Sequence, residues 1–242
     1  MPQADAVTGF GGYLVSSRDL EEYRAMLTLD DADLAGSVLD CPGGGASFTA
    51  SACALGADAH AVDPVYAVPV DELEARLGTE LERGRAWAAA RADAHRWDLH
   101  GDPDALTRRR AASAAHFTAH RRAAPERYVA ASLPHLPFAA ASADLVVSSH
   151  LLFTYADRLD RAAHLAALLE MARVARREVR VYPLVDVAGR PLDELLAVLR
   201  RDLAARGVAT EVRQVAHEFQ RGARHLLAVD ATGPTAEVGA SI

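Results

Sequence analysis

The chain has 242 residues, of which 50% are hydrophobic and 24% are charged, and its formal net charge at pH 7 is -7. This composition is typical of a globular protein with one large domain, and the negative charge argues against a nucleic-acid-binding surface, which needs concentrated positive charge. Long apolar runs without charge are absent and the first residues show no basic stretch followed by an apolar run, so we expect a cytoplasmic protein with no membrane association.

The first predicted elements form a strand, loop, helix and strand. Apolar residues at helical spacing predict a helix within 18–35, and we interpret residues 1–36 as an N-terminal helical cap. A short strand at 37–40 leads through three glycines into a helix over 46–55, and a second strand follows at 59–64. This is the span of a βαβ unit, so we expect the two strands to be parallel.

The segment 67–126 is longer than a crossover between parallel strands requires. Its pattern predicts two helices, over 70–96 and 103–123, and we interpret it as a helical insert. Both tryptophans of the chain, Trp87 and Trp97, lie in it. Two interpretations stay open: the aromatic residues anchor the insert on the sheet, or the insert is a lid over a ligand pocket.

Arginine runs and cysteines carry little functional signal here. The chain contains no lysine, so the runs at 108–110 and 121–122 reflect coding bias, and we interpret them as solvated helix faces more readily than as phosphate contacts.

The two cysteines, Cys41 and Cys53, can build neither a disulfide framework nor a zinc site alone. We expect two buried thiols and no metal.

After the insert the alternation of strands and helices resumes, and it ends in two runs that predict an antiparallel pair. The predicted strands cover 127–132, 143–149, 178–185, 210–219 and 224–230, and the predicted helices cover 157–175 and 190–207. The small, polar residues 231–242 are interpreted as a flexible tail.

Several motifs, taken with this order of elements, resemble the class I S-adenosylmethionine-dependent methyltransferases over about residues 35–230. The motifs are "LDCPGGGASF", "AVDPVY" and "ASLPHLPFAAASADLVVSSHLL". The resemblance implies an α/β fold, with a doubly wound, Rossmann-like, seven-stranded sheet that is mostly parallel and has an antiparallel edge. It also implies that residues 37–230 form the methyltransferase-like domain and that the cofactor is S-adenosyl-L-methionine. The departures from the family pattern are Pro42 and Ala46, where glycines are usual, and Ser132, where an acidic residue is common.

The resemblance also implies which residues contact the cofactor. Glycines in the loop after the first strand leave clearance for a bound molecule and permit a positive φ. An acidic residue at the end of the second strand accepts hydrogen bonds from both ribose hydroxyls, although an aspartate before proline is also a common way to open a turn. The expected cofactor-binding residues are Asp40, Cys41, Pro42, Gly43, Gly44, Asp63, Pro64, Ser132, Leu133, Ser148 and Ser149.

Methyl transfer needs little acid–base chemistry, because the sulfonium is already a good leaving group. Catalysis can therefore come from holding the acceptor in line and excluding water. If a base is needed, His150 is the candidate, although it can equally line the pocket, and Tyr155 is a second candidate for contact with the acceptor.

Two hypotheses about function remain at this point. The first is an enzyme that methylates a small molecule, and the second is a non-catalytic regulatory protein that binds S-adenosylmethionine or another nucleoside on the same scaffold. An enzyme should have an enclosed acceptor cavity, which Trp87, Trp97 or Phe117 could plug in a binding protein. A nicotinamide-dependent enzyme is disfavoured because the glycine spacing does not fit G-x-G-x-x-G. The oligomeric state is left open.

Overall fold

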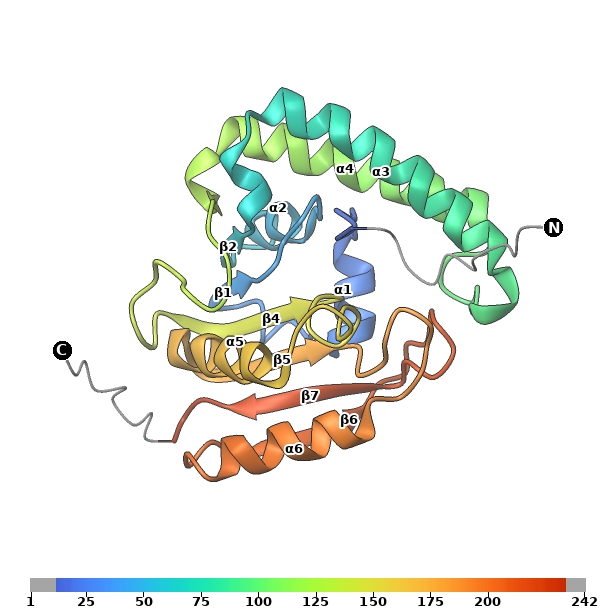
Figure 1. The fold of residues 1–242 in the computed structure, drawn as a ribbon. Helices are drawn as coiled ribbons and strands as arrows, with labels where there is room; N and C mark the ends of the chain where they lie inside the picture. Colours follow the sequence, from blue (N-terminus) through green and yellow to red (C-terminus); the bar gives the residue numbers. More distant parts are fainter. Residues whose placement is uncertain (1–11, 234–242) are drawn as a thin grey trace.

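The computed structural model describes residues 12–233, and a single seven-stranded sheet runs through it (Figure 1). The strand order is β3-β2-β1-β4-β5-β7-β6. The strands are β1 (Ser37–Asp40), β2 (Asp58–Val62), β3 (Tyr128–Val129), β4 (Ala143–Ser149), β5 (Ala175–Tyr182), β6 (Thr210–Gln214) and β7 (His225–Asp230). The pairs among β1 to β5 are all parallel, and β7 is antiparallel to both β5 and β6. The predicted fold class is confirmed.

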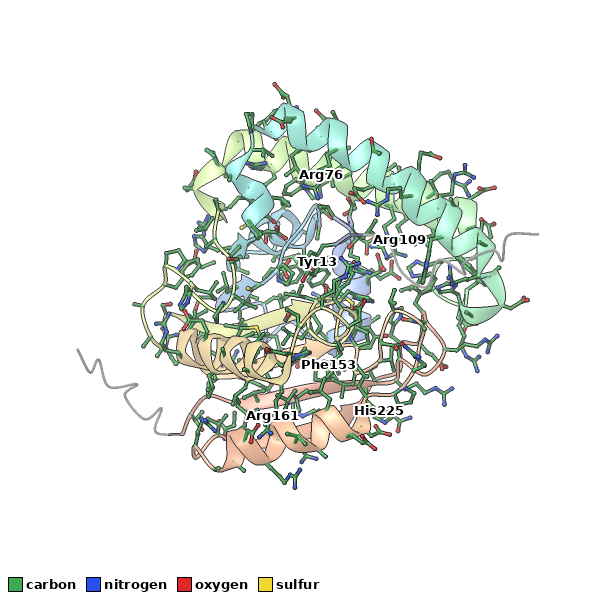
Figure 2. The ribbon with its side chains drawn as sticks, in the orientation of Figure 1. Tyr13, Arg76, Arg109, Phe153, Arg161 and His225 are labelled. Carbon is green, nitrogen blue, oxygen red and sulfur yellow. The ribbon has the colours of Figure 1, made fainter. Side chains whose placement is uncertain are left out.

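Helices cover both faces of this sheet, and the alternation of side chains along β4 shows how. Val146 packs with α5 (Arg161–Val174) and α6 (Asp193–Ala204) in one buried cluster, to which Phe153 also belongs (Figure 2). Leu145 and Val147 point the other way and pack with α1 (Leu20–Leu27) and α2 (Phe48–Ala54). Successive residues of a strand face opposite sides, so a fully apolar strand is buried on both faces.

Three predicted elements are shorter in the structure than the sequence pattern indicated. The helix expected within 18–35 is α1, which ends where Thr28 takes a left-handed conformation with φ 53°. The helix expected from residue 157 begins at Arg161, because Asp160 accepts a hydrogen bond from the amide of Ala163 at 2.7 Å and so caps it. The strand expected over 127–132 pairs only at Tyr128 and Val129.

The segment expected as an insert forms two long helices, α3 (Val70–Ala90) and α4 (Pro103–Ala123), which pack side by side (Figure 1). Short 3-10 turns lie at Pro64–Ala67, Ala92–Ala94 and Pro125–Arg127. Near the sheet, the helix pair rests on a buried cluster that includes Phe117, which packs against the rings of Tyr66 and Tyr128.

The far end of the α3–α4 pair docks on the loop between β6 and β7. The amide of Arg96 donates to the carbonyl oxygen of Phe219 at 2.7 Å, and the amide of Arg221 donates to that of Ala94 at 2.9 Å. The ring of Trp97 lies 5.4 Å from that of Phe219, edge to face. The helix pair thus bridges the two ends of the sheet above the carboxyl ends of the parallel strands.

The division into a cap, a central domain and a tail remains an interpretation. Residues 1–11 of the expected cap and 234–242 of the expected tail lie outside the described residues. Within the described part, no helix is both long enough and apolar enough to cross a membrane.

Candidate functional site

A cavity of about 670 Å³ lies at the carboxyl ends of β1, β2 and β4. One side of its wall consists of the glycine loop after β1 and the residues that follow β2 and β4. The opposite side comes from α3 and α4 and from Phe219 and Gln220 of the β6–β7 loop. This volume is in the range of pockets that hold cofactors and small molecules, and the carboxyl edge of a doubly wound sheet is where such ligands bind.

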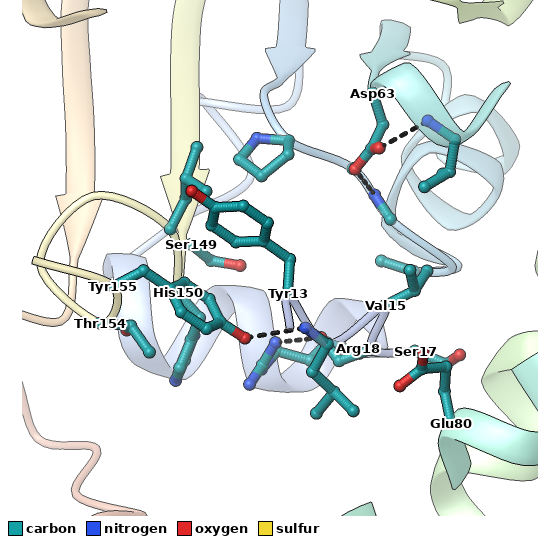
Figure 3. Close-up of a pocket in the computed structure, with 18 of the residues that line it drawn as sticks. Tyr13, Val15, Ser17, Arg18, Asp63, Glu80, Ser149, His150, Thr154 and Tyr155 are labelled. Atoms are coloured by element: carbon teal, nitrogen blue, oxygen red, sulfur yellow. Dashed lines mark hydrogen bonds between the residues drawn. The ribbon is translucent and has the colours of Figure 1, made fainter. Parts of the chain in front are cut away.

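Residues 12–18, which we call the N-terminal strap, close the cavity between these two sides (Figure 3). The amide of Gly45 donates to the carbonyl oxygen of Ser16 at 3.1 Å, and the amide of Leu14 donates to the hydroxyl of Tyr155 at 2.9 Å. The ring of Tyr13 lies 4.8 Å from the ring of Tyr155. The strap therefore holds the glycine loop at one end and the segment after β4 at the other.

Gly44 has the positive φ that we expected in this loop, but Gly43 and Gly45 are required for a different reason than clearance for a ligand. A Cβ on Gly43 would lie 2.5 Å from the hydroxyl of Tyr66, and a Cβ on Gly45 would lie 2.5 Å from Leu77 Cδ2. Gly44 has φ +53°, a conformation that costs other residues free energy. The clearance that Gly43 and Gly45 provide thus serves the chain's own close packing, although the backbones of Gly43 and Gly44 also line the cavity.

We expect Gly43→Ala to destabilise the protein by about 1–3 kcal/mol, because the added methyl overpacks a buried contact. Ala61 cannot move aside easily, since its Cβ would be 2.7 Å from the new one and it lies in β2. Gly78→Ala is the matched control: nothing lies within 4 Å of its Cβ position, and this helical site should gain about 0.5–1 kcal/mol. Chemical denaturation of both variants measures the difference, and a stable Gly43→Ala protein would contradict the packing argument.

Asp63, which follows β2, has its carboxylate at the cavity wall and is 8% exposed. One oxygen accepts a hydrogen bond from the amide of Gly44 at 3.0 Å, and the other accepts one from the amide of Val65 at 2.9 Å. Burial raises the pKa of this carboxyl, and the two amides oppose that shift. The side chain therefore fixes the glycine loop, and each oxygen keeps a second lone pair for a ligand hydroxyl.

Two of the expected cofactor contacts lie behind the cavity wall. Asp40 is only 1% exposed, and its Oδ2 accepts a hydrogen bond from the hydroxyl of Tyr23 at 2.9 Å. Ser148 is fully buried on β4. Asp40 and Ser148 do not line the cavity, whereas their neighbours Tyr23 and Ser149 do. Asp40 thus positions Tyr23, and burial raises its own pKa well above the usual value.

The other expected contacts all face the cavity: Cys41, Pro42, Gly43, Gly44, Asp63, Pro64, Ser132, Leu133 and Ser149. They come from the ends of four strands, β1, β2, β3 and β4, which the parallel sheet brings to one edge. Their individual contacts with a cofactor stay predictions.

His150 and Tyr155, the residues expected near the acceptor, also line the cavity (Figure 3). His150 takes a left-handed conformation with φ 53°, a strained backbone of the kind found at functional sites. Burial holds the pKa of its imidazole well below the usual value, and nearby Arg18 and Arg110 lower it further. The ring is therefore uncharged at neutral pH and is a weak base. Tyr155 uses its hydroxyl to accept the hydrogen bond from the strap.

Sequence reasoning missed the polar residues that the strap and the insert contribute to the wall. Arg18 comes from the strap, Arg76 and Glu80 from α3, and Thr107 and Arg110 from α4. No single spacing in the sequence marks these residues as a set, because they come from three separate elements. Within residues 12–233, no group of three His, Cys, Asp or Glu side chains could hold a metal ion.

The residues present fit a nucleoside cofactor. The carboxylate of Asp63 faces the cavity, as ribose hydroxyls require, and the backbone of the glycine loop is accessible beside it. Asp40 Oδ1, which is buried behind this wall, has no hydrogen-bond partner among the described residues.

Residues 83–182 match a family model described as a methyltransferase domain. No curated protein matches the chain by sequence. Among solved structures, the magnesium protoporphyrin IX methyltransferase from Synechocystis PCC 6803 is 14% identical, with a TM-score of 0.46, over 87% of this chain and 77% of that chain. The mitomycin 7-O-methyltransferase is 14% identical, with a TM-score of 0.43, over 87% of this chain and 53% of that one. A methyltransferase from Methanosarcina mazei is 10% identical, with a TM-score of 0.40, over 80% of this chain and 89% of that one.

Proposed function

The chain carries a class I S-adenosylmethionine-dependent methyltransferase domain, and from this premise we propose that the acceptor of the methyl group is a small molecule bound in the same cavity. The observation that carries the proposal is that the strap, α3 and α4, and the β6–β7 loop wall this cavity on the sides away from the sheet. A walled cavity suits a small molecule, whereas a protein or nucleic-acid acceptor needs an open surface.

The aromatic residues that could have plugged the cavity leave it free. Phe117 is buried against Tyr66 and Tyr128, and Trp97 packs on Phe219. Trp87 is part of the wall. This arrangement supports an acceptor pocket over a purely regulatory binding site, with Trp97 anchoring the insert and Trp87 facing the cavity.

The chemistry that this site would perform is mainly positioning. S-adenosylmethionine supplies the activated methyl group. The contribution of the chain is to hold the acceptor at near-attack distance and to keep water out of the cavity. His150 is uncharged at neutral pH and can receive a proton from an acceptor, but its depressed pKa limits its strength as a base. We therefore assign most of the catalysis to proximity and desolvation.

S-adenosylhomocysteine is expected to raise the melting temperature, and NAD is expected to leave it unchanged. A ligand at about 100 times its dissociation constant stabilises the folded state by about 2.7 kcal/mol. The glycine loop turns sharply at Gly44 and places its amide on Asp63, which leaves no cradle for a pyrophosphate. Differential scanning fluorimetry with matched concentrations of the two ligands checks the result, and equal stabilisation by NAD would contradict the proposed cofactor site.

A further inference from the structure

The three consecutive arginines of α4 have three different environments. Arg108 is exposed to solvent. Arg109 forms ion pairs with Asp19 and with Glu21, and it lies on the side of the helix pair that faces α1 (Figure 2). Arg110 turns inward and lines the cavity. Since each residue of a helix is rotated by about 100° from the one before it, one run of arginines supplies a solvated side chain, a surface ion pair and a buried cation.

Arg110 is a cation with spare hydrogen-bonding capacity. Its side chain is 11% exposed, and its Nη2 donates to Glu22 Oε1 at 2.7 Å. Its Nη1 is buried and has no hydrogen-bond partner among the described residues. Burial lowers the pKa of this guanidinium to about 10. A buried donor without a partner costs free energy, and an anion in the cavity would provide the missing acceptor.

Arg110 and Arg18 share one buried carboxylate at this end of the cavity. Glu22 Oε1 pairs with Arg110, Arg18 Nε lies 4.0 Å from it, and His100 Nε2 lies 3.6 Å from it. Asp19 and Glu21 are engaged by Arg109 instead. The charges of the cluster balance overall, but two guanidinium groups face one carboxylate here, and a bound anion would give Arg110 Nη1 the acceptor that it lacks.

The histidines packed around Arg110 add no charge to this end of the cavity. Burial lowers the pKa of His100 to about 3 and that of His217 to about 4, and it holds that of His150 well below the usual value. All three rings are uncharged at neutral pH. The charged donors beside Glu22 are thus Arg18 and Arg110.

The wall next to Arg110 is apolar and aromatic. Leu106 precedes it on α4, Trp87 comes from α3, and Phe219 comes from the β6–β7 loop. In Figure 3, Arg18 reaches into the cavity beside Tyr155, on the side where the acceptor residues were expected. The residues expected to hold the cofactor lie instead at the strand ends and in the glycine loop.

We propose that Arg110, with Arg18 beside it, binds a carboxylate of the methyl acceptor, and that the aromatic wall holds an apolar, aromatic body attached to that carboxylate. The planar guanidinium can pair with both oxygens of a carboxylate, which fixes orientation as well as affinity. This substrate class rests on the proposed methyl transfer to a small molecule. The cofactor also carries a carboxylate, so the experiment separates the two sources.

The test is a titration of protein saturated with S-adenosylhomocysteine, using 4-hydroxybenzoate and its neutral isostere 4-hydroxybenzamide. Calorimetry should show that the wild type binds the acid at least about 10-fold more tightly than the amide, as expected for a charge-assisted pair in a shielded site. Arg110→Met should abolish this preference. Arg108→Met, which removes the same charge from an exposed neighbour, should keep it.

Separate controls distinguish a carboxylate of the acceptor from the carboxylate of the cofactor, and they also test whether the variants fold. The affinity for S-adenosylhomocysteine should be the same in all three proteins, and a fall in Arg110→Met alone would assign Arg110 to the cofactor and overturn the proposal. Because Arg110→Met leaves Glu22 unpaired, the double variant Glu22→Gln, Arg110→Met provides a form without the buried charge, and it should also lack the preference.

The remaining outcomes are equally decisive. Equal binding of acid and amide by the wild type, a preference that survives in both Arg110 variants, or binding of neither probe would each overturn the carboxylate site while leaving the methyltransferase function intact. A wild type that fails to bind S-adenosylhomocysteine would instead overturn the proposed function on which the site rests.

Discussion

Asp63→Ala is expected to weaken the binding of S-adenosylhomocysteine by about 2–4 kcal/mol, which is roughly 30- to 1000-fold in the dissociation constant. The reason is that hydrogen bonds to a charged acceptor are lost in a site shielded from water. Two contributions add up in this variant. The ribose hydroxyls would lose their acceptor, and the amide of Gly44 would lose the oxygen that holds it at 3.0 Å. Isothermal titration calorimetry measures the change directly.

Asp58→Ala is the control, because Asp58 begins the same strand that Asp63 follows. It lies at the amino end of β2, away from the cavity, where it is exposed and pairs with Arg127. Its loss should leave the affinity for S-adenosylhomocysteine unchanged. If Asp63→Ala also bound the ligand like the wild type, the role of Asp63 would be confined to opening the turn and holding the loop.

Glu22→Ala is expected to lower the free energy of unfolding by about 3–5 kcal/mol, since removing one partner of a buried ion pair leaves the other charge uncompensated. The Glu22 side chain is 2% exposed, and its carboxylate is the counter-ion of Arg110 at 2.7 Å. It also lies near Arg18 and His100. Denaturation by urea, monitored by circular dichroism, measures the loss.

The neighbouring residue offers a matched comparison. Glu21 is in the same turn of α1 and also pairs with an arginine of α4, but its side chain is 66% exposed. Exposed pairs contribute about 0–1 kcal/mol, so Glu21→Ala should cost no more than that. Similar losses in the two variants would show that the buried network around Arg110 does not stabilise α1 against α4, and the charge balance inferred for the cavity would need revision.

The succession of strands and helices along the chain and the position of the cofactor loop could be predicted from the sequence because they depend on local patterns. The strands at Ser37–Asp40 and Ala143–Ser149 were found with their correct bounds, since each is a short run rich in apolar residues. The glycine run between β1 and α2, and Asp63 after β2, marked the ligand edge, because a parallel sheet brings the ends of its strands together. The resemblance to a family then supplied the cofactor.

The end of α1 and the reason for the glycines depended on contacts that no local pattern records. Helical spacing suggested a helix within 18–35, but Thr28 ends it in a left-handed turn. Gly43 and Gly45 are crowded by Tyr66 and by Leu77. A glycine needed for a ligand and a glycine needed for packing look the same in a sequence, because only the neighbouring atoms distinguish them.

The acceptor side of the cavity was decided by tertiary structure alone. Arg18 and Arg110 are 92 positions apart in the sequence, yet they share Glu22 because α4 packs beside the strap and α1. Helical periodicity indicates that Arg108, Arg109 and Arg110 point in different directions, but it does not say which direction meets a carboxylate, a cavity or solvent. That depends on how the α3–α4 pair docks on the sheet and on the β6–β7 loop, and long-range packing of this kind leaves no periodic trace in the chain.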